Sequence, residues 1–256
     1  MTYLDLIILG IIQGITEFLP ISSSGHLVLF QYFLNVKANG VLLEVLLHFG
    51  TLMAIIYYYF NDIKDLIKNV CIGHKTSINY FIYIIIATIP IAITGYMVRD
   101  VIEYIFNPYM TFYMYIITGM ILLLTYFKNN NLNSKINLFS AMIIGLSQSF
   151  ALLPGISRSG ITISFGLFCG IKHNEAAKFS FLLSIPALVG AIILQLLELK
   201  KMYIVDLLPL IIGMISAAIS GYLIISWLIV IIAKGKFYYF SFYCFLLAFI
   251  GLFFIL

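Results

Sequence analysis

Charged residues are scarce in this sequence. Only 9% of its 256 residues are Asp, Glu, Lys or Arg, whereas 63% are hydrophobic, and the mean hydropathy is +1.11. A water-soluble fold of this length could not bury so much apolar surface, but a lipid bilayer accepts it. We therefore predict an integral membrane protein with one membrane domain, residues 1–256, and no soluble module.

Cysteine is also rare, and a basic leader is absent. Cys71, Cys169 and Cys244 are widely spaced and form no metal-binding or disulfide pattern. The first residues, MTYLDLIILG, lack the basic stretch and small-residue cleavage site of a signal peptide, so we expect the first apolar segment to be retained. The net charge of +4 is modest and its lysines lie in short loops, which favours membrane orientation over nucleic-acid binding.

Long apolar runs dominate the rest of the chain. Crossing about 30 Å of hydrocarbon takes about 20 residues. Six runs qualify: 41–60, 80–98, 110–127, 179–197, 207–233 and 237–256. Two further apolar regions, 6–36 and 136–171, are interrupted by LPISSSGH and LPGISRSG. Such a break at membrane depth is tolerated only where protein or a watery cavity covers the freed backbone, so we predict two re-entrant hairpins, with eight full spans as the alternative.

The two interrupted regions resemble each other. Residues 10–28 align without a gap on residues 145–163, an internal repeat. The matched pairs include Gly10 and Gly145, Gln13 and Gln148, Ile21 and Ile156, Ser22 and Ser157, Ser24 and Ser159, and Gly25 and Gly160. Each half, about 1–130 and about 136–256, is then one hairpin followed by three spans.

Because three spans are an odd number, the second half must enter the membrane from the opposite side. The predicted fold class is thus an all-α polytopic membrane protein with an inverted repeat. This plan is known from transporters, and it places a site where the broken helices meet near mid-membrane.

Lysines in the loops support this topology. If both termini face outside, nine lysines lie inside and four basic residues outside, as the positive-inside rule requires. The inner set is Lys64, Lys68, Lys75, Lys128, Lys135, Lys172, Lys178, Lys234 and Lys236, and the outer set is Lys37, Arg99, Lys200 and Lys201.

Each interrupted region carries a single formal charge in its middle. Glu17 is alone between Asp5 and Lys37, and Arg158 is alone between Lys135 and Lys172. A charge at membrane depth costs about 3 kcal/mol or more, which makes it a functional hypothesis with a partner to be named. The repeat pairs Glu17 with Arg158. A buried ion pair that only fixes the packing of the two halves is the alternative interpretation.

The residues around this pair favour a binding site. Small hydroxyl residues and glycines at a helix start expose backbone N–H groups, which bind anions, and an arginine fork matches phosphate oxygens. The candidate phosphate-binding residues are Ser22, Ser24, Gly25, Gly155, Ser157, Ser159, Gly160 and Thr162, together with Gln13. For Ser22 and Ser24, helix capping is the favoured interpretation, because serines before a helix are more often caps than nucleophiles.

Three spacings suggest further chemistry. Gln13 and Glu17 are four apart and share a helix face, where their oxygens could hold a divalent cation, Mg²⁺ or Ca²⁺. Ser23 and His26, three apart, offer a hydroxyl nucleophile with a base, or an imidazole that attacks phosphorus itself. Glu44 and His48, four apart on the first span, could flank the site or hydrogen-bond each other.

Two stretches, QGITEFLPISSSGH and LPGISRSGITIS, resemble the signature motifs of the undecaprenyl-diphosphate phosphatase family, bacterial membrane enzymes associated with bacitracin resistance. The first family motif is E or Q followed by three residues and E, and the second is P-G-x-S-R-S-x-x-T. The resemblance extends over the whole chain in length, motif separation and span pattern. One departure is Gln13, an allowed variant that removes a carboxylate and weakens the case for a cation held by two protein carboxylates.

The resemblance implies hydrolysis of the terminal phosphate of undecaprenyl diphosphate in a bacterial plasma membrane, with the site facing outside and the lipid monophosphate returned to peptidoglycan and envelope synthesis. It implies a divalent metal. It also makes Gln13 and Glu17 the first-motif pair, with Ser23 and His26 following, and makes the second-motif residues phosphate binders: Ser157, Arg158, Ser159 and Thr162. The predicted partners are a polyprenyl diphosphate and the bilayer, with a homodimer as one candidate assembly. Glu17, Ser23, His26 and Arg158 are the predicted catalytic residues.

A transporter is the competing function. Inverted repeats with broken helices are typical of carriers, so a polyprenyl-phosphate flippase or an anion carrier fits the same pattern. Release of inorganic phosphate in detergent separates the two, because transport needs two sides. A structural scaffold would leave Glu17, Arg158 and the serine-rich turns unexplained.

Overall fold

The computed structural model describes residues 3–33, 41–98, 108–128, 132–198 and 207–255. Within these ranges the chain is helical and has no strand. The helices are α1 (Tyr3–Phe18), α2 (Ser23–Phe33), α3 (Val41–Tyr58), α4 (Phe60–Cys71), α5 (Lys75–Val98), α7 (Pro108–Leu124), α8 (Leu138–Ser149), α9 (Arg158–Phe168), α10 (His173–Glu198), α11 (Leu207–Ala233) and α12 (Phe240–Ile250). Short 3₁₀ or π turns extend some of them, at Thr125–Lys128, Phe150–Leu152, Phe237–Tyr239 and Gly251–Ile255.

Four predicted spans are confirmed as helices long and apolar enough to cross a bilayer: Lys75–Val98, Tyr109–Lys128, His173–Leu197 and Leu208–Ala233. The predicted span 41–60 reaches this length only together with α4, to which α3 is bent by 70°. The last predicted span, 237–256, contains a shorter apolar helix, Phe237–Phe253. The chain is therefore an all-α, multi-pass membrane protein.

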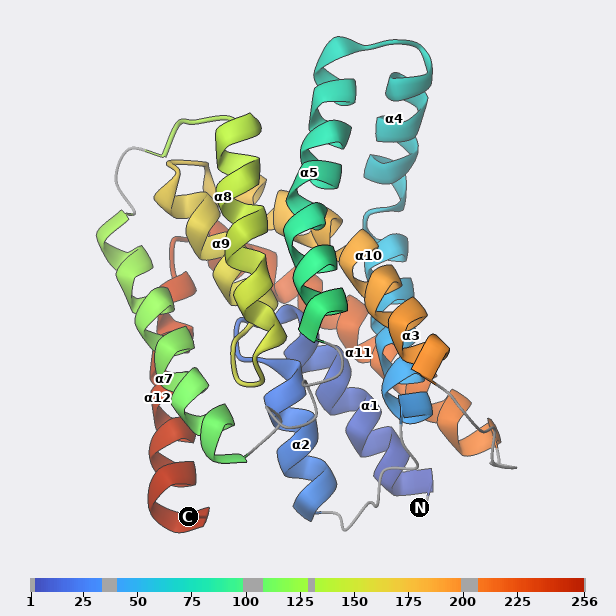
Figure 1. Cartoon of the computed structure of the whole chain (residues 1–256), viewed down its shortest axis with the longest axis vertical. Coiled ribbons are helices and arrows are strands. Elements are labelled where there is room, and N and C mark those ends of the chain that lie inside the picture. Colours follow the sequence, from blue (N-terminus) through green and yellow to red (C-terminus); the bar gives the residue numbers. More distant parts are fainter. Residues whose placement is uncertain (1–2, 34–40, 99–107, 129–131, 199–206, 256) are drawn as a thin grey trace.

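The two interrupted regions form helical hairpins. Figure 1 shows α1 rising from the end of the molecule at which α1 begins and α12 finishes to a turn near the middle, from which α2 runs back to the same end. Helix α8 descends from the opposite end to a second turn near the middle, from which α9 runs back (Figure 1). Helix α1 packs on α11 of the second half, and α8 packs on α5 of the first half. The inverted repeat of the two halves stays a prediction from the aligned motifs.

The segment after α3 differs from the expected inner loop, because residues Phe60–Cys71 form helix α4. Its charges suit the helix dipole, with Asp62 in the first turn and Lys68 in the last. Asp62 also forms an ion pair with Lys178 of α10. None of the residues of α4 is buried, so α4 stands beside α5 at the periphery (Figure 1).

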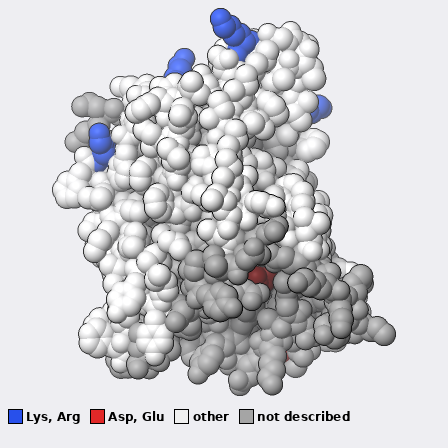
Figure 2. Space-filling model, in the orientation of Figure 1, with Lys and Arg blue, Asp and Glu red and all other residues white. Residues whose placement is uncertain are grey.

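Lysines flank one end of the molecule. Figure 2 shows the lysines of the visible face gathered toward the end that carries the turn between α4 and α5, which we call the lysine-rich end. This asymmetry agrees with the predicted inner loops. Lys37, Arg99, Lys200 and Lys201, predicted outside, lie beyond the described residues.

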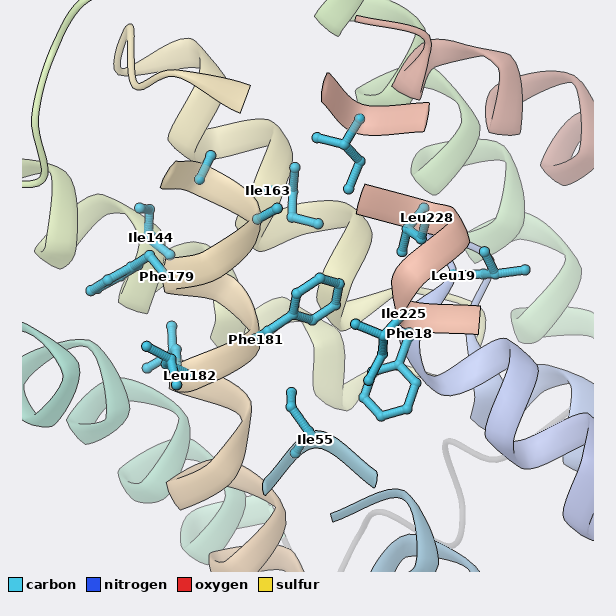
Figure 3. Close-up of a cluster of buried hydrophobic side chains, with 14 of the residues drawn as sticks. Phe18, Leu19, Ile55, Ile144, Ile163, Phe179, Phe181, Leu182, Ile225 and Leu228 are labelled. Atoms are coloured by element: carbon cyan, nitrogen blue, oxygen red, sulfur yellow. The ribbon is translucent and has the colours of Figure 1, made fainter. Parts of the chain in front are cut away.

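An aromatic and aliphatic core supports the turn of the first hairpin. Phe18, the last residue of α1, packs edge to face on Phe181 of α10, with ring centroids 6.0 Å apart. Ile55 from α3 and Ile225 and Leu228 from α11 surround these rings (Figure 3). These contacts hold Phe18 and so fix the end of α1, where Glu17 is the preceding residue.

Small residues allow α1 to approach α11 closely. A Cβ atom added at Gly10 would lie 2.2 Å from the carbonyl oxygen of Gly213, and one at Gly14 would lie 2.0 Å from Ser220 Oγ. Membrane helices pack tightly at such positions because lipid tails supply no hydrophobic drive for association. The hairpin is thereby held against the second half of the chain.

Gly10→Ala should therefore destabilise the protein. The added methyl group meets backbone and overpacks the interface, at a cost of about 1–3 kcal/mol. Gly190→Ala is the matched control, because a Cβ there meets nothing within 4 Å and alanine favours the helix. Thermal unfolding in detergent should show a lower midpoint for Gly10→Ala alone. Equal midpoints for the two variants would contradict the close packing of α1 on α11.

Candidate active site

The two hairpin turns interlock through hydrogen bonds. The carbonyl oxygen of Leu19 accepts from Ser159 Oγ at 3.0 Å and from Ser157 Oγ at 3.4 Å. In return, the backbone N–H of Gly155 donates to Ser22 Oγ at 3.2 Å. These polar groups are buried, so each bond satisfies an atom that water cannot reach. The relative position of the turns is thereby fixed.

Unusual backbone conformations shape both turns. Ser22 has a φ of 64°, and it is the one non-glycine residue with positive φ in the described part of the chain. Such strain persists only where the surroundings enforce it, and it is common at functional sites. Gly155 has a φ of 92°, and a Cβ there would lie 2.3 Å from the carbonyl oxygen of Thr111. Only glycine fits this position.

Helix α9 begins at Arg158 because Ser157 caps it. Ser157 Oγ accepts from the backbone N–H of Gly160 at 3.1 Å. Thr162 Oγ1 donates to the Arg158 carbonyl at 2.8 Å and pairs with Ser180 Oγ of α10 at 2.6 Å. The hydroxyls of the second motif thus contact protein groups, and their phosphate-binding role stays a prediction.

Glu17 and Arg158 meet, as the aligned motifs predict. Arg158 Nη2 donates to Glu17 Oε1 at 2.8 Å, and the two side chains are only 13% and 6% exposed. The last turn of α1 and the first residue of α9 supply them. One charge from each hairpin therefore forms a single buried pair between the turns.

Three more groups converge on the other oxygen of Glu17. Oε2 accepts from Ser23 Oγ at 2.6 Å and from Gln13 Nε2 at 3.1 Å. His48 Nε2 lies 3.9 Å from the same oxygen, while His48 Nδ1 lies 2.8 Å from the backbone carbonyl oxygen of Glu44. His48 therefore lies beside the site and also pairs with the backbone of Glu44, so the two alternatives for His48 hold together.

Two buried polar atoms at this cluster have no hydrogen-bond partner among the described residues. They are Arg158 Nη1, a donor, and Gln13 Oε1, an acceptor. Five other buried polar atoms of the described residues also lack a partner, but these two lie beside the buried ion pair, which makes them candidate contacts for a charged ligand. A donor of this kind suits a phosphate oxygen, and an amide oxygen suits a hard cation.

His26 is occupied by partners other than Ser23. Its Nε2 lies 2.8 Å from the Tyr243 hydroxyl, and its Nδ1 lies 2.7 Å from the Ser22 carbonyl oxygen and 3.0 Å from the Tyr115 hydroxyl. The ring also stacks on Tyr243, with centroids 5.7 Å apart. Ser23 instead donates to Glu17, so the serine and histidine of the first motif serve different partners.

Sequence reasoning missed Tyr115 and Tyr243. The chain has 18 tyrosines, and nothing near these two in the sequence distinguishes them from lipid-facing residues. Tyr115 leaves no room for a side chain at Gly25, because a Cβ there would lie 2.4 Å from the Tyr115 hydroxyl. Ser24 Oγ pairs with Ser22 Oγ at 3.2 Å. Of these two predicted phosphate-binding positions, Ser24 thus has its contact inside the first turn, whereas Gly25 lies against Tyr115 of α7.

The described residues contain no group of three His, Cys, Asp or Glu side chains able to hold a metal ion. A cation at this cluster would have one protein carboxylate, Glu17, and the orphan oxygen of Gln13. Magnesium and calcium commonly complete such a set with water and substrate phosphates, so the residues fit a cation that binds together with a phosphate ligand.

Comparison with known proteins agrees with the motifs. Residues 6–250 match the model of the family described as bacitracin resistance protein BacA. Relatives named undecaprenyl-diphosphatase include one from Caldicellulosiruptor bescii, 39% identical over 97% of this chain and 96% of the relative. Others come from Halothermothrix orenii, 40% identical over 95% of both chains, and from Methanobrevibacter smithii, 36% identical over 98% and 96%. The chain belongs to the bacitracin resistance protein BacA family.

Proposed function

We propose that this protein hydrolyses the terminal phosphate of undecaprenyl diphosphate, giving undecaprenyl phosphate and inorganic phosphate. The family and the names of the relatives support this activity. The observation that carries it is the convergence of Ser23, Arg158 and Gln13 on the buried carboxylate of Glu17, with one donor and one acceptor unpaired beside it. This set provides a nucleophile, a base and an anion-binding group.

Arg158 would hold the diphosphate. One nitrogen of its guanidinium is bound by Glu17, which fixes the plane of the fork, and the orphan Nη1 is left to donate to a phosphate oxygen. Arg158 also begins α9, whose positive dipole end favours an anion. Phosphoryl transfer relies mainly on such positioning and charge stabilisation.

Ser23 would attack the terminal phosphorus. Its hydroxyl already donates to Glu17, which accepts the proton as the new bond from Oγ to phosphorus forms and the bond to the lipid monophosphate breaks. Water then attacks the phosphoserine and releases inorganic phosphate. His26 is the weaker candidate nucleophile, because both of its ring nitrogens lie within hydrogen-bond distance of other groups.

A divalent cation, Mg²⁺ or Ca²⁺, would be held by Gln13 Oε1, Glu17 and the substrate phosphates. When bound it would neutralise charge on the diphosphate. Gln13 Nε2 donates to Glu17, and this bond fixes the amide so that Oε1 stays available.

We further propose that the protein lies in the bacterial plasma membrane with its site open to the outer side. The lysine-rich end would face the cytoplasm, and the hairpin α1–α2 would enter from outside. The lipid product would return to envelope synthesis, in a family described by bacitracin resistance.

Ser23→Ala should abolish turnover. Loss of the nucleophile is expected to lower kcat by at least about a thousandfold. Ser184→Ala is the control, because Ser184 is buried and its hydroxyl donates to the Phe181 carbonyl of its own helix. Release of inorganic phosphate from undecaprenyl diphosphate in detergent is the readout, and it excludes transport as a cause of signal. A Ser23→Ala enzyme as active as Ser184→Ala would refute the nucleophile.

Arg158→Lys should lower kcat/KM by about a hundredfold. The lysine keeps the charge but has no planar fork, so it cannot bind Glu17 and a phosphate oxygen in the same geometry. The same phosphate-release assay measures the loss, with thermal unfolding to show that the variant is folded. Near-normal turnover by the lysine variant would rule out the assigned role of Arg158.

Gln13→Glu should strengthen cation binding. Without a cation the new carboxylate and Glu17 repel each other, and with a cation both coordinate it. The Mg²⁺ concentration for half-maximal activity should therefore fall by about tenfold. Gln148→Ala, at the matching position of the second hairpin, should leave this concentration unchanged. Chelator-treated enzyme titrated with Mg²⁺ or Ca²⁺ gives the measurement, and an unchanged or higher requirement in Gln13→Glu would argue against a cation at this pair.

A further inference from the structure

His48 of α3 faces the carboxylate of Glu17 without forming a hydrogen bond to it. Its Nε2 lies 3.9 Å from Glu17 Oε2, which is beyond hydrogen-bond distance. The side chain of His48 is 20% exposed and that of Glu17 is 6% exposed, so the histidine is the more accessible of the two. Helix α3 packs on α1, and this contact holds His48 beside the last turn of α1.

The other ring nitrogen of His48 determines where the lone pair of the ring lies. Nδ1 is 2.8 Å from the backbone carbonyl oxygen of Glu44, and a carbonyl oxygen can only accept a hydrogen bond. Nδ1 therefore carries the hydrogen in the neutral ring, and the lone pair of Nε2 is directed at the carboxylate of Glu17. Two acceptors that face each other repel, so a proton or a metal ion is expected between them.

The separation of the two acceptors favours a metal ion. A shared proton draws a charged nitrogen and a carboxylate oxygen to about 2.7–2.9 Å from each other. Two ligand atoms of one metal ion each lie about 2.0–2.2 Å from it and are therefore about 3–4 Å apart. The 3.9 Å between His48 Nε2 and Glu17 Oε2 agrees with the second case.

The groups around Glu17 leave room for such an ion. Its carboxylate accepts three hydrogen bonds, from Arg158, Ser23 and Gln13, and a carboxylate has about four acceptor positions. Gln13 Oε1 has no partner among the described residues. An imidazole nitrogen, a carboxylate and an amide oxygen therefore come together from α1 and α3.

From these contacts, and resting on the proposed function, we propose that His48 Nε2 is a third protein ligand of the divalent cation, beside Glu17 and Gln13 Oε1. Histidines that bind metal ions almost always donate their other ring N–H to a carbonyl or a carboxylate, as His48 does to Glu44. An imidazole nitrogen suits first-row transition ions, whereas Mg²⁺ and Ca²⁺ prefer oxygen ligands. His48 thus gives the site a preference for an ion such as Co²⁺ or Zn²⁺ over Mg²⁺.

Metal binding without substrate tests this assignment. Calorimetry on the tag-free protein in detergent would give the Kd for Co²⁺ and for Mg²⁺ in the wild type, His48→Ala and His74→Ala. His48→Ala should raise the Kd for Co²⁺ by at least about tenfold and that for Mg²⁺ by less than about threefold, because the hard ion gains little from a nitrogen ligand. His74→Ala is the matched control, because this exposed histidine lies at the lysine-rich end, and it should change neither Kd.

Pulsed EPR with Mn²⁺ as a paramagnetic probe detects the nitrogen ligand directly. The wild type should show the hyperfine coupling of an imidazole nitrogen to the bound ion, His48→Ala should lose it, and His74→Ala should keep it. If His48→Ala does not fold, His48→Gln takes its place, because glutamine is closer in size and has no imidazole. Absence of the coupling in the wild-type protein would overturn the proposal without any variant.

The remaining outcomes separate the two proposals. An unchanged Kd for Co²⁺ in His48→Ala, or an equal loss of affinity for Co²⁺ and Mg²⁺, would overturn the assignment of His48 as a ligand. Phosphate release from undecaprenyl diphosphate is measured separately. A wild-type protein that binds Co²⁺ through His48 but releases no phosphate would refute the proposed function and leave the metal ligand in place.

Discussion

The ion pair between Glu17 and Arg158 is the contact on which the arrangement of this protein depends. An acid at the end of α1 and a base at the start of α9 lie between two hairpins that enter from opposite ends. A charge left alone at this depth would be costly, so the turns are stable only where they meet. The bonds from Leu19 to Ser157 and Ser159 hold them together there.

This requirement explains why the two motifs contain so many small polar residues. Ser157 caps α9, Ser159 bonds the opposite turn, and Ser22 accepts from Gly155, so these hydroxyls build the geometry around the pair. Ser23 differs from them because its hydroxyl faces the carboxylate. A run of three serines thus divides into residues that form the turn and one that faces the proposed reaction centre.

The lipid environment imposes a second constraint, since a charged group and a long hydrocarbon chain must be bound side by side. Interlocked turns supply a polar centre, and a separate apolar groove lies between the first hairpin and α11–α12. Each hairpin packs on a helix of the other half, so both halves contribute to both features. The site exists only in the assembled fold.

The membrane class, the two hairpins and the pairing of Glu17 with Arg158 could be predicted from the sequence, because hydrophobic run length is a local property and charge is so scarce that each buried charge stands out. The sequence did not reveal α4, whose terminal charges suit the helix dipole and whose Asp62 pairs with Lys178 of α10. Nor did it reveal Tyr115 and Tyr243, which lie 89 and 217 positions from His26 among many similar tyrosines. The choice of Ser23 for Glu17 over His26 emerges from the folded turn, because the positive φ of Ser22 sets where α2 begins and how its first side chains point.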